Sequence, residues 1–172
     1  MNRRFFITTS TISFFTLIAC NNKQKNSYTH YLESEIGKIT TLKGEIIHVC
    51  PIEGQKMKLQ LPDGEVICIL PSNGEPFLKK QWDKKKVKIS GMLKEKRFMR
   101  NTILTNYQDK KLLCHIDYTP CIDTKWIENR QKDGSAERLL ERDNELLLGK
   151  MQTTKLNYIQ VFSLTADEIV EV

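Results

Sequence analysis

Histidine and cysteine side chains that could carry chemistry gather in two short segments. His48 and Cys50 are two residues apart and would share one face of a regular strand, and Cys114, His115 and Cys121 form the second group. Imidazole nitrogens and thiolate sulfurs are typical ligands of zinc and copper. One hypothesis is therefore a metal or thiol-redox site made from these five residues. Against it, the segments are more than 60 residues apart, and neither contains a Cys-x-x-Cys pair.

A nucleophilic cysteine is a second interpretation of the same residues. Cysteine catalysis needs an imidazole within hydrogen-bond reach of the sulfur, whereas neighbours in sequence such as Cys114 and His115 usually point in different directions. The sequence also has no Gly-x-Ser-x-Gly, His-Glu-x-x-His or phosphate-binding glycine motif. We therefore predict a binding protein that is not an enzyme and has no cofactor, with zinc or copper as the alternative.

Residues 79–100 form a strongly basic window, with ten Lys or Arg residues against Asp83 and Glu95. The window carries +8, whereas the whole chain of 172 residues carries +6, so the remainder is net acidic. A solvated face that keeps a sheet edge from pairing is the ordinary interpretation. The alternative is binding of anionic lipid headgroups by the lysines at its start: Lys79, Lys80, Lys84, Lys85, Lys86 and Lys88.

The amino-terminal residues predict export. Arg3 and Arg4 precede an uncharged run over 5–19, which is too short to cross a bilayer stably but suits a secretory signal peptide. Leu17-Ile18-Ala19-Cys20 resembles the lipobox of bacterial lipoproteins, in which the cysteine is acylated and becomes the new amino terminus. The resemblance implies removal of residues 1–19, anchoring to a lipid bilayer through palmitate or a similar acyl chain on Cys20, and a flexible polar tether over 20–36.

This resemblance also implies a location. Asn21 follows the cysteine, which in the sorting rule of enteric lipoproteins favours the outer membrane, and no acidic surface-export run follows. We expect a protein on the periplasmic face of the outer membrane, with an unknown periplasmic ligand or protein as partner and no nucleic acid. An oxidising compartment also permits disulfides. Cys114 and Cys121 enclose a short loop that contains Pro120 and are the predicted pair.

From Gly37 onward the sequence predicts a small barrel over residues 37–97. Short alternating runs separated by turn residues are typical of strands, which we expect at 39–52, 56–61, 65–70 and 86–93. A Pro62-Asp63-Gly64 turn joins the second and third, and a short helical turn precedes the fourth. This is the order of an OB-type barrel. We therefore predict a mainly β protein with helical additions, built on a five-stranded OB-type barrel.

The rest of the chain is expected to complete this barrel. The sequence predicts a helical insertion over 98–150 and one or more terminal strands over 151–172. Within the insertion, a helix over 135–148 would end at Gly149 as its C′ residue. The last segment predicts a strand over 157–162, a turn at 165–167 and a short returning strand.

Three segments of the barrel region resemble a family of uncharacterised OB-fold lipoproteins from Bacteroidetes. They are Leu42-Lys43-Gly44-Glu45-Ile46-Ile47-His48-Val49-Cys50, Gly54-Gln55-Lys56-Met57 and Val87-Lys88-Ile89-Ser90-Gly91, and Asp133-Gly134-Ser135-Ala136-Glu137 is similar too. The resemblance covers residues 38–96 best. It implies an OB fold and a lipid anchor, and it implies no particular activity.

Overall fold

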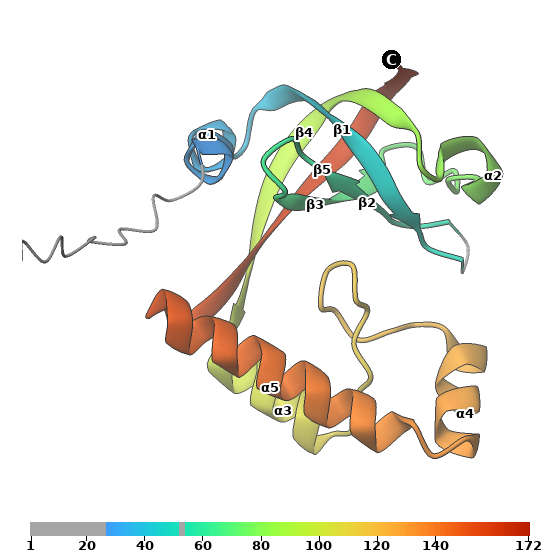
Figure 1. Cartoon of the computed structure of the whole chain (residues 1–172), viewed down its shortest axis with the longest axis vertical. Coiled ribbons are helices and arrows are strands. Elements are labelled where there is room, and N and C mark those ends of the chain that lie inside the picture. The colour runs from blue at the N-terminus through green and yellow to red at the C-terminus, as the bar shows by residue number, and fades with distance from the viewer. Residues whose placement is uncertain (1–26, 52–53) are drawn as a thin grey trace, which may run out of the picture.

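The computed structural model describes residues 27–51 and 54–172. Within them the chain forms a β-barrel at one end and a group of helices at the other (Figure 1). Cys20 and the predicted signal peptide lie outside the described residues.

Five strands close the barrel in the described part of the chain: β1 (Ile39–Val49), β2 (Met57–Gln60), β3 (Val66–Pro71), β4 (Lys86–Met99) and β5 (Tyr158–Glu171). Their order around the barrel is β1-β2-β3-β5-β4, and β4 pairs back to β1. Neighbouring strands are antiparallel except β3 and β5, which are parallel. The predicted five-stranded OB-type barrel, with a helical insertion before the last strand, is confirmed.

Alternation along the strands fills the barrel with apolar side chains. Met57 and Leu59 are fully buried, whereas Lys58 between them points to the outer face, as the period of two requires. The β2–β3 hairpin closes at the predicted turn, where the Leu61 amide donates to the Glu65 carbonyl and Gly64 adopts a φ of 89°. The short helix α2 (Lys79–Trp82) connects β3 to β4.

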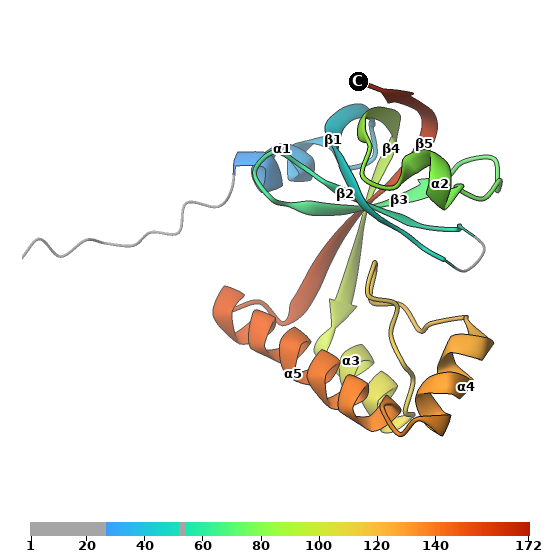
Figure 2. The same cartoon turned by 45° about the vertical axis from the view of Figure 1, so that its right-hand side comes forward.

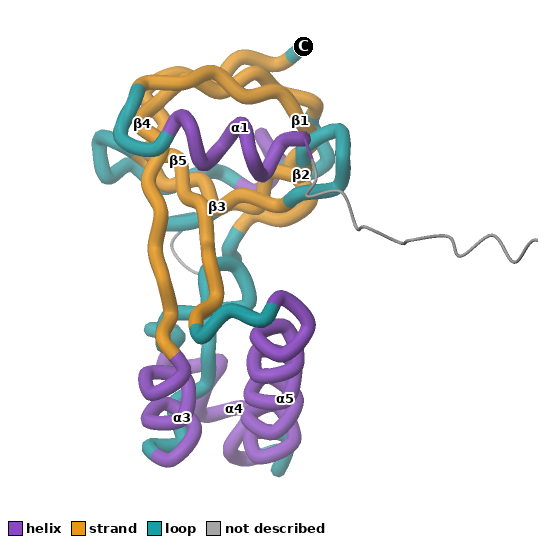
Figure 3. Tube along the Cα trace, turned by 90° about the vertical axis from the view of Figure 1, so that its left-hand side faces the viewer, coloured by secondary structure: helices purple, strands orange, loops and turns teal. Residues whose placement is uncertain are grey.

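β4 and β5 continue beyond the barrel as a two-stranded ribbon (Figures 2 and 3). Their pairing reaches Met99 opposite Tyr158, so β4 is longer than the predicted strand over 86–93. The predicted turn at 165–167 is wrong. Ser90 pairs with Glu168 and Gly91 with Ala166, so Asp167 forms a bulge and β5 continues as one strand.

The far end of the ribbon carries the helical insertion, which consists of α3 (Arg100–Gln108), α4 (Thr124–Lys132) and α5 (Ala136–Thr154). Phe98 and Ile159 of the ribbon pack with Ile103, Leu147 and Met151 in a core separate from that of the barrel. Gly149 lies inside α5, so its prediction as a C′ residue is wrong. The helix instead ends at Lys155, whose φ of 57° is left-handed. α4 has no buried residue, which explains why no apolar pattern predicted it.

Part of the predicted tether is also ordered on the barrel. Residues 27–35 form α1 (Ser27–Glu35), and Leu32 is fully buried in the barrel core. The hydroxyls of Tyr31 and Thr40 are 3.0 Å apart, which joins the helix to β1. The expected tether over 20–36 is therefore corrected for residues 27–35, because burial of Leu32 and partial burial of Tyr28 offset the lack of apolar periodicity.

Gly91 provides a test of barrel closure. An added Cβ at this position would overlap the backbone carbonyl of Thr165 on β5. We expect Gly91→Ala to lower the free energy of unfolding by about 1–3 kcal/mol because backbone atoms must shift. Gly149→Ala is the matched control. Its new Cβ meets no atom within 4 Å inside α5, so it should stabilise the protein by about 0.5–1 kcal/mol. Urea unfolding of both variants measures this, and equal effects would contradict it.

Candidate ligand-binding cleft

A cleft of about 460 Å³ lies between the barrel and the helical insertion. Its walls come from the β2–β3 hairpin, the loop at 115–118, the carboxyl end of α5 and the ribbon part of β5. Its lining includes the side chains of Lys58, Glu65, Val66, His115, Tyr118 and Lys150. OB-type barrels bind ligands on the β2–β3 face and on the loops after β1 and β4. The insertion is the connection after β4, so it forms the second wall of that surface.

The barrel wall contains a row of paired residues. His48 on β1 pairs with Lys58 on β2, and Lys58 pairs with Cys68 on β3. Directly paired residues in a sheet lie on the same face. Cys68 is only 2% exposed, although it lies on the outer face, because other parts of the chain cover the row. Lys58 is therefore flanked within the sheet by an imidazole and a thiol.

A shielded ion pair fastens the insertion to the barrel. The Lys56 ammonium donates to Asp117 Oδ2 over 2.7 Å and to Thr119 Oγ1 over 3.0 Å. Exposed fractions of the two charged side chains are 21% and 15%. Burial alone would raise the pKa of Asp117, but hydrogen bonds from Lys56 and Thr119 and the Lys56 charge outweigh it and lower that pKa. This contact holds the loop at 115–118 over β2.

Lys58 and Lys150, from opposite walls, both line the cleft. No ion pair within 4.0 Å involves Lys58 or Lys150 among the described residues. Burial lowers the pKa of Lys58; Cys114 opposes this change and the charge of Lys150 adds to it. The Lys150 ammonium donates to the Tyr118 hydroxyl over 2.9 Å and lies 5.2 Å from that ring's centroid. Each wall therefore brings one ammonium group to the cleft, and Glu65 brings a carboxylate to the barrel wall.

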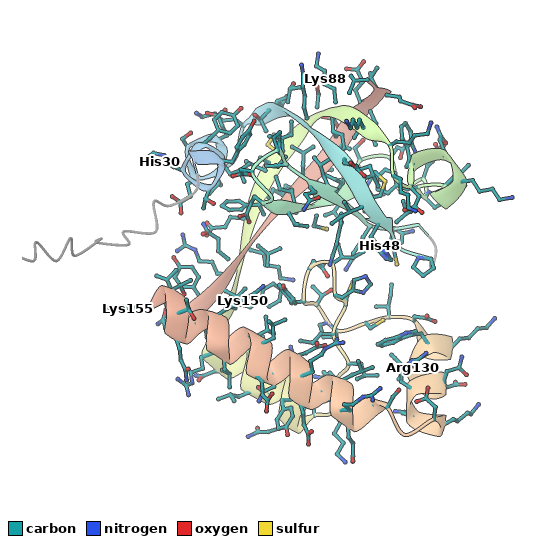
Figure 4. All side chains as sticks on the ribbon, viewed as in Figure 1. His30, His48, Lys88, Arg130, Lys150 and Lys155 are labelled. Atoms are coloured by element: carbon teal, nitrogen blue, oxygen red, sulfur yellow. The ribbon has the colours of Figure 1, made fainter. Side chains whose placement is uncertain are left out.

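His48 and His115, which are distant in sequence, meet in space. Their ring centroids are 4.6 Å apart in an edge-to-face arrangement, and Figure 4 shows His48 at the barrel edge nearest the insertion. Although part of the His115 ring reaches solvent, partial burial lowers its pKa to about 4, and Lys58 and His48 lower it further in the same direction. The imidazole is therefore neutral at neutral pH and adds no positive charge to the cleft.

The predicted zinc or copper site is not assembled. Cys50, Cys114 and Cys121 border a separate hollow of about 30 Å³, which His48 and His115 do not line. In residues 27–51 and 54–172, no three His, Cys, Asp or Glu side chains are arranged to hold a metal ion. His48 pairs with Lys58, and the Cys50 amide donates to the Lys56 carbonyl, so His48 and Cys50 share the outer face of the barrel as predicted. The expected ligand set still does not form, because His48 contacts His115 whereas Cys50 lies beside Cys114 and Cys121.

The predicted disulfide is also wrong, because Cys114 and Cys121 are both free thiols. Leu113 pairs with Pro120 across the loop, the Cys114 amide donates to Thr119, and the Cys121 amide donates to Leu112. The two cysteines are therefore diagonal neighbours. Such neighbours are about 7–8 Å apart, beyond the usual Cα separation of a disulfide.

The six lysines predicted to bind anions do not line the cleft. They are spread over α2, the following loop and β4, and the side chain of Lys79 lies outside the described part of the chain. The ammonium of Lys85 is 2.6 Å from a carboxylate oxygen of Glu171. Lys86 of β4 lies directly opposite Glu45 of β1 in the sheet. Lys80, Lys84 and Lys88 are exposed, and Lys88 lies on the side of the barrel away from the insertion (Figure 4). Headgroup binding by this stretch stays a prediction.

Sequence reasoning missed Lys58, Asp117, Tyr118 and Lys150. The alternation of β2 predicted that Lys58 faces outward, but it gave no sign that a loop almost 60 residues later would cover it. The available signal was a pair of lysines, Lys56 and Lys58, on the outer side of one short strand. The later segment that covers them, residues 115–118, contains a single acidic residue, Asp117. Two positive charges facing one negative charge leave one lysine without a carboxylate.

The ion pair between Lys56 and Asp117 predicts an acid-sensitive fold. Asp117→Asn should lower the free energy of unfolding at neutral pH by about 1–3 kcal/mol, because it removes a charge-assisted hydrogen bond. The lowered pKa means that Asp117 stabilises the fold above its ordinary pKa of 3.8, and that this contribution fades as pH falls through the folded pKa. Urea unfolding at several pH values measures both effects.

An exposed ion pair offers the control for this variant. Lys110 and Glu137 are 3.7 Å apart and at least 75% exposed, so Glu137→Gln should change stability by less than about 0.5 kcal/mol. Similar losses in the Asp117→Asn and Glu137→Gln variants would show that the loop is not held by Asp117.

Comparison with known proteins adds no family assignment. No protein-family model, curated protein or solved structure matches the chain. In the described part of the chain, no helix is both long and apolar enough to cross a membrane. The geometry and chemistry of the cleft are therefore the guide to function.

Proposed function

We propose that this chain is a non-catalytic binding module of an exported lipoprotein, with its ligand in the cleft between barrel and insertion. The observation that carries the proposal is the position of the cleft. It joins the ligand-binding face of an OB-type barrel to a wall made by the insertion. A volume of about 460 Å³ suits a small molecule. Val66, Val161 and Leu156 supply apolar surface, while Lys58 and Lys150 supply hydrogen-bond donors.

The nearby thiols support binding rather than covalent catalysis. Burial raises the pKa of Cys114, and it raises the pKa of Cys68 to about 12. Both side chains are therefore protonated at neutral pH, and a thiol is a much weaker nucleophile than a thiolate. The same pKa values disfavour thiol-redox chemistry at these two positions.

Export is the second part of the proposal and rests on the sequence. A basic start, an uncharged run and Leu17-Ile18-Ala19-Cys20 support acylation of Cys20. Acyl chains would hold the protein in the outer membrane, facing the periplasm, since each buried methylene contributes about 0.8 kcal/mol. A periplasmic ligand or protein is then the expected partner.

Acylation has a direct test in cells. Metabolic labelling with radioactive palmitate should mark the wild-type protein, and globomycin should cause the unprocessed precursor to accumulate. Cys20→Ala should abolish the label because the acylated sulfur is gone. Cys121→Ala removes a cysteine outside the motif and should leave labelling unchanged. Equal labelling of the Cys20→Ala and wild-type proteins would overturn the proposed anchor.

Ligand binding in the cleft can be tested with a panel of cell-wall fragments and small sugars: N-acetylglucosamine oligomers, muropeptides, glucose, glucuronate and glucose 6-phosphate. Amide NMR spectra of the purified protein should show shifts at cleft residues with at least one of them. Val66 is 36% exposed and lines the cleft. Val66→Trp should therefore weaken that binding by about tenfold or more, because the larger indole side chain would occupy part of the cleft.

Val170→Trp is the matched control for the filled cleft. Val170 lies on β5 opposite Lys88, is 46% exposed, and does not line the cleft. This variant should bind as the wild type does. If no member of the panel shifts cleft amides, or if Val66→Trp binds as well as Val170→Trp, the proposed ligand site is wrong.

A further inference from the structure

We propose that the cleft recognises a small ligand through an oxyanion, a phosphate or a carboxylate, held between Lys58 of β2 and Lys150 of α5. This inference rests on the proposed function of the cleft and specifies its ligand class. It differs from the headgroup hypothesis for the lysines at 79–88, because it involves other residues on another surface.

Two lysines on the same side of the barrel differ in their partners. Lys56 and Lys58 are two residues apart at β2, and both lie near Cys114 of the insertion. Lys56 has a carboxylate partner in Asp117, whereas Lys58 is in no ion pair among the described residues. Partial burial of an ammonium group is unfavourable unless a negative charge compensates it. An oxyanion in the cleft would give the Lys58 ammonium a negatively charged partner, as the Asp117 carboxylate does for Lys56.

Lys150 brings a second ammonium group to the cleft. This residue comes from α5 on the opposite wall, yet its charge contributes to lowering the pKa of Lys58, so the two ammonium groups repel each other across the cleft. Hydrogen bonding and ring contact with Tyr118 hold Lys150 in place. Tyr118 itself has a φ of 57°, an uncommon left-handed conformation for a tyrosine. An oxyanion between the two ammonium groups would turn their repulsion into attraction.

The other charged lining group limits the ligand. Glu65 also lines the cleft, and burial followed by the charge of Asp63 raises its pKa, while Lys150 lowers it. A ligand with negative charge along its whole length would meet this carboxylate. A ligand with one oxyanion and a hydroxyl-rich remainder fits better, because hydroxyl groups can donate to Glu65 and the remainder can contact Val66 and Leu156. A sugar acid or a sugar phosphate has this chemistry.

Matched sugars test this inference. Glucuronate and glucose 6-phosphate carry the two oxyanions, and glucose is their neutral counterpart. Isothermal titration of the purified protein should show that at least one anionic sugar binds about tenfold or more tightly than glucose, because charge-assisted hydrogen bonds add affinity. Which of the two binds more tightly distinguishes a carboxylate ligand from a phosphate ligand.

Variants that remove one positive charge locate the binding site. Lys58→Gln and Lys150→Gln should each weaken binding of the preferred anionic sugar by about tenfold or more. Glu65→Gln leaves both ammonium groups in place, so this variant should still bind the anionic sugar more tightly than glucose. Lys88→Gln makes the same change in net charge outside the cleft and should bind as the wild type does. Lys150 is exposed on α5, so its substitution leaves the fold intact even if Lys58→Gln disturbs β2.

The outcomes separate this inference from the proposed function. Cleft binding of glucose or another neutral panel member at least as tight as that of the anionic sugars would overturn the oxyanion proposal and leave the binding module standing. Equal losses in Lys150→Gln and Lys88→Gln would also overturn it, since only the net charge would then matter. Absence of any cleft binding would overturn both.

Discussion

The pairing of β4 with β5 is the constraint on which the rest of this molecule depends. The two strands stay paired from Val87 opposite Glu171 to Met99 opposite Tyr158, which takes them through the barrel and out to the helices. Leu93 and Leu164 belong to the barrel core, whereas Phe98 and Ile159 belong to the core of the insertion. Figure 3 shows β4 and β5 running from the barrel to the helices. One ladder therefore fixes the separation of two apolar cores, and with it the separation of the cleft walls.

A single ladder would leave the insertion free to swing about the ribbon. The ion pair of Lys56 with Asp117 supplies a second attachment. It lies at the start of β2, a strand that is not adjacent to β4 or β5 in the barrel. Two separated attachments define the orientation of a rigid body far better than one does. The cleft can thus be preorganised for a ligand, which limits the ordering cost of binding.

Most of the barrel could be predicted from the sequence, because alternation and turn chemistry are local properties. Met57 and Leu59 inside, the turn at Gly64 and the strand from Lys86 all follow from residues close together in the chain. The errors have nonlocal causes. Asp167 looks like a turn residue and is a bulge because β4 holds the strand on both sides of it. Leu32 looks isolated and is buried because the barrel has space for it.

The cleft itself lay beyond sequence reasoning for the same reason. Its charged groups come from positions 58, 65 and 150, and no local pattern relates them. Cysteine and histidine spacing suggested a metal site because such residues bind metals, yet His48 and His115 contact each other while Cys50, Cys114 and Cys121 border a separate hollow. Residue types alone indicated possible chemistry, and register decided which side chains meet.

Barrel closure by the carboxyl-terminal strand has a consequence for the order of folding. β5 is the last element of the chain, and its parallel contact with β3 joins Cys68 to Ser163, 95 residues later. Contacts so distant in sequence form slowly. Until β5 docks, β3 and β4 each keep an open edge capable of pairing with another chain. The helices of the insertion are local structures that form earlier, so the unfinished barrel is the stage at which this protein is most prone to aggregate.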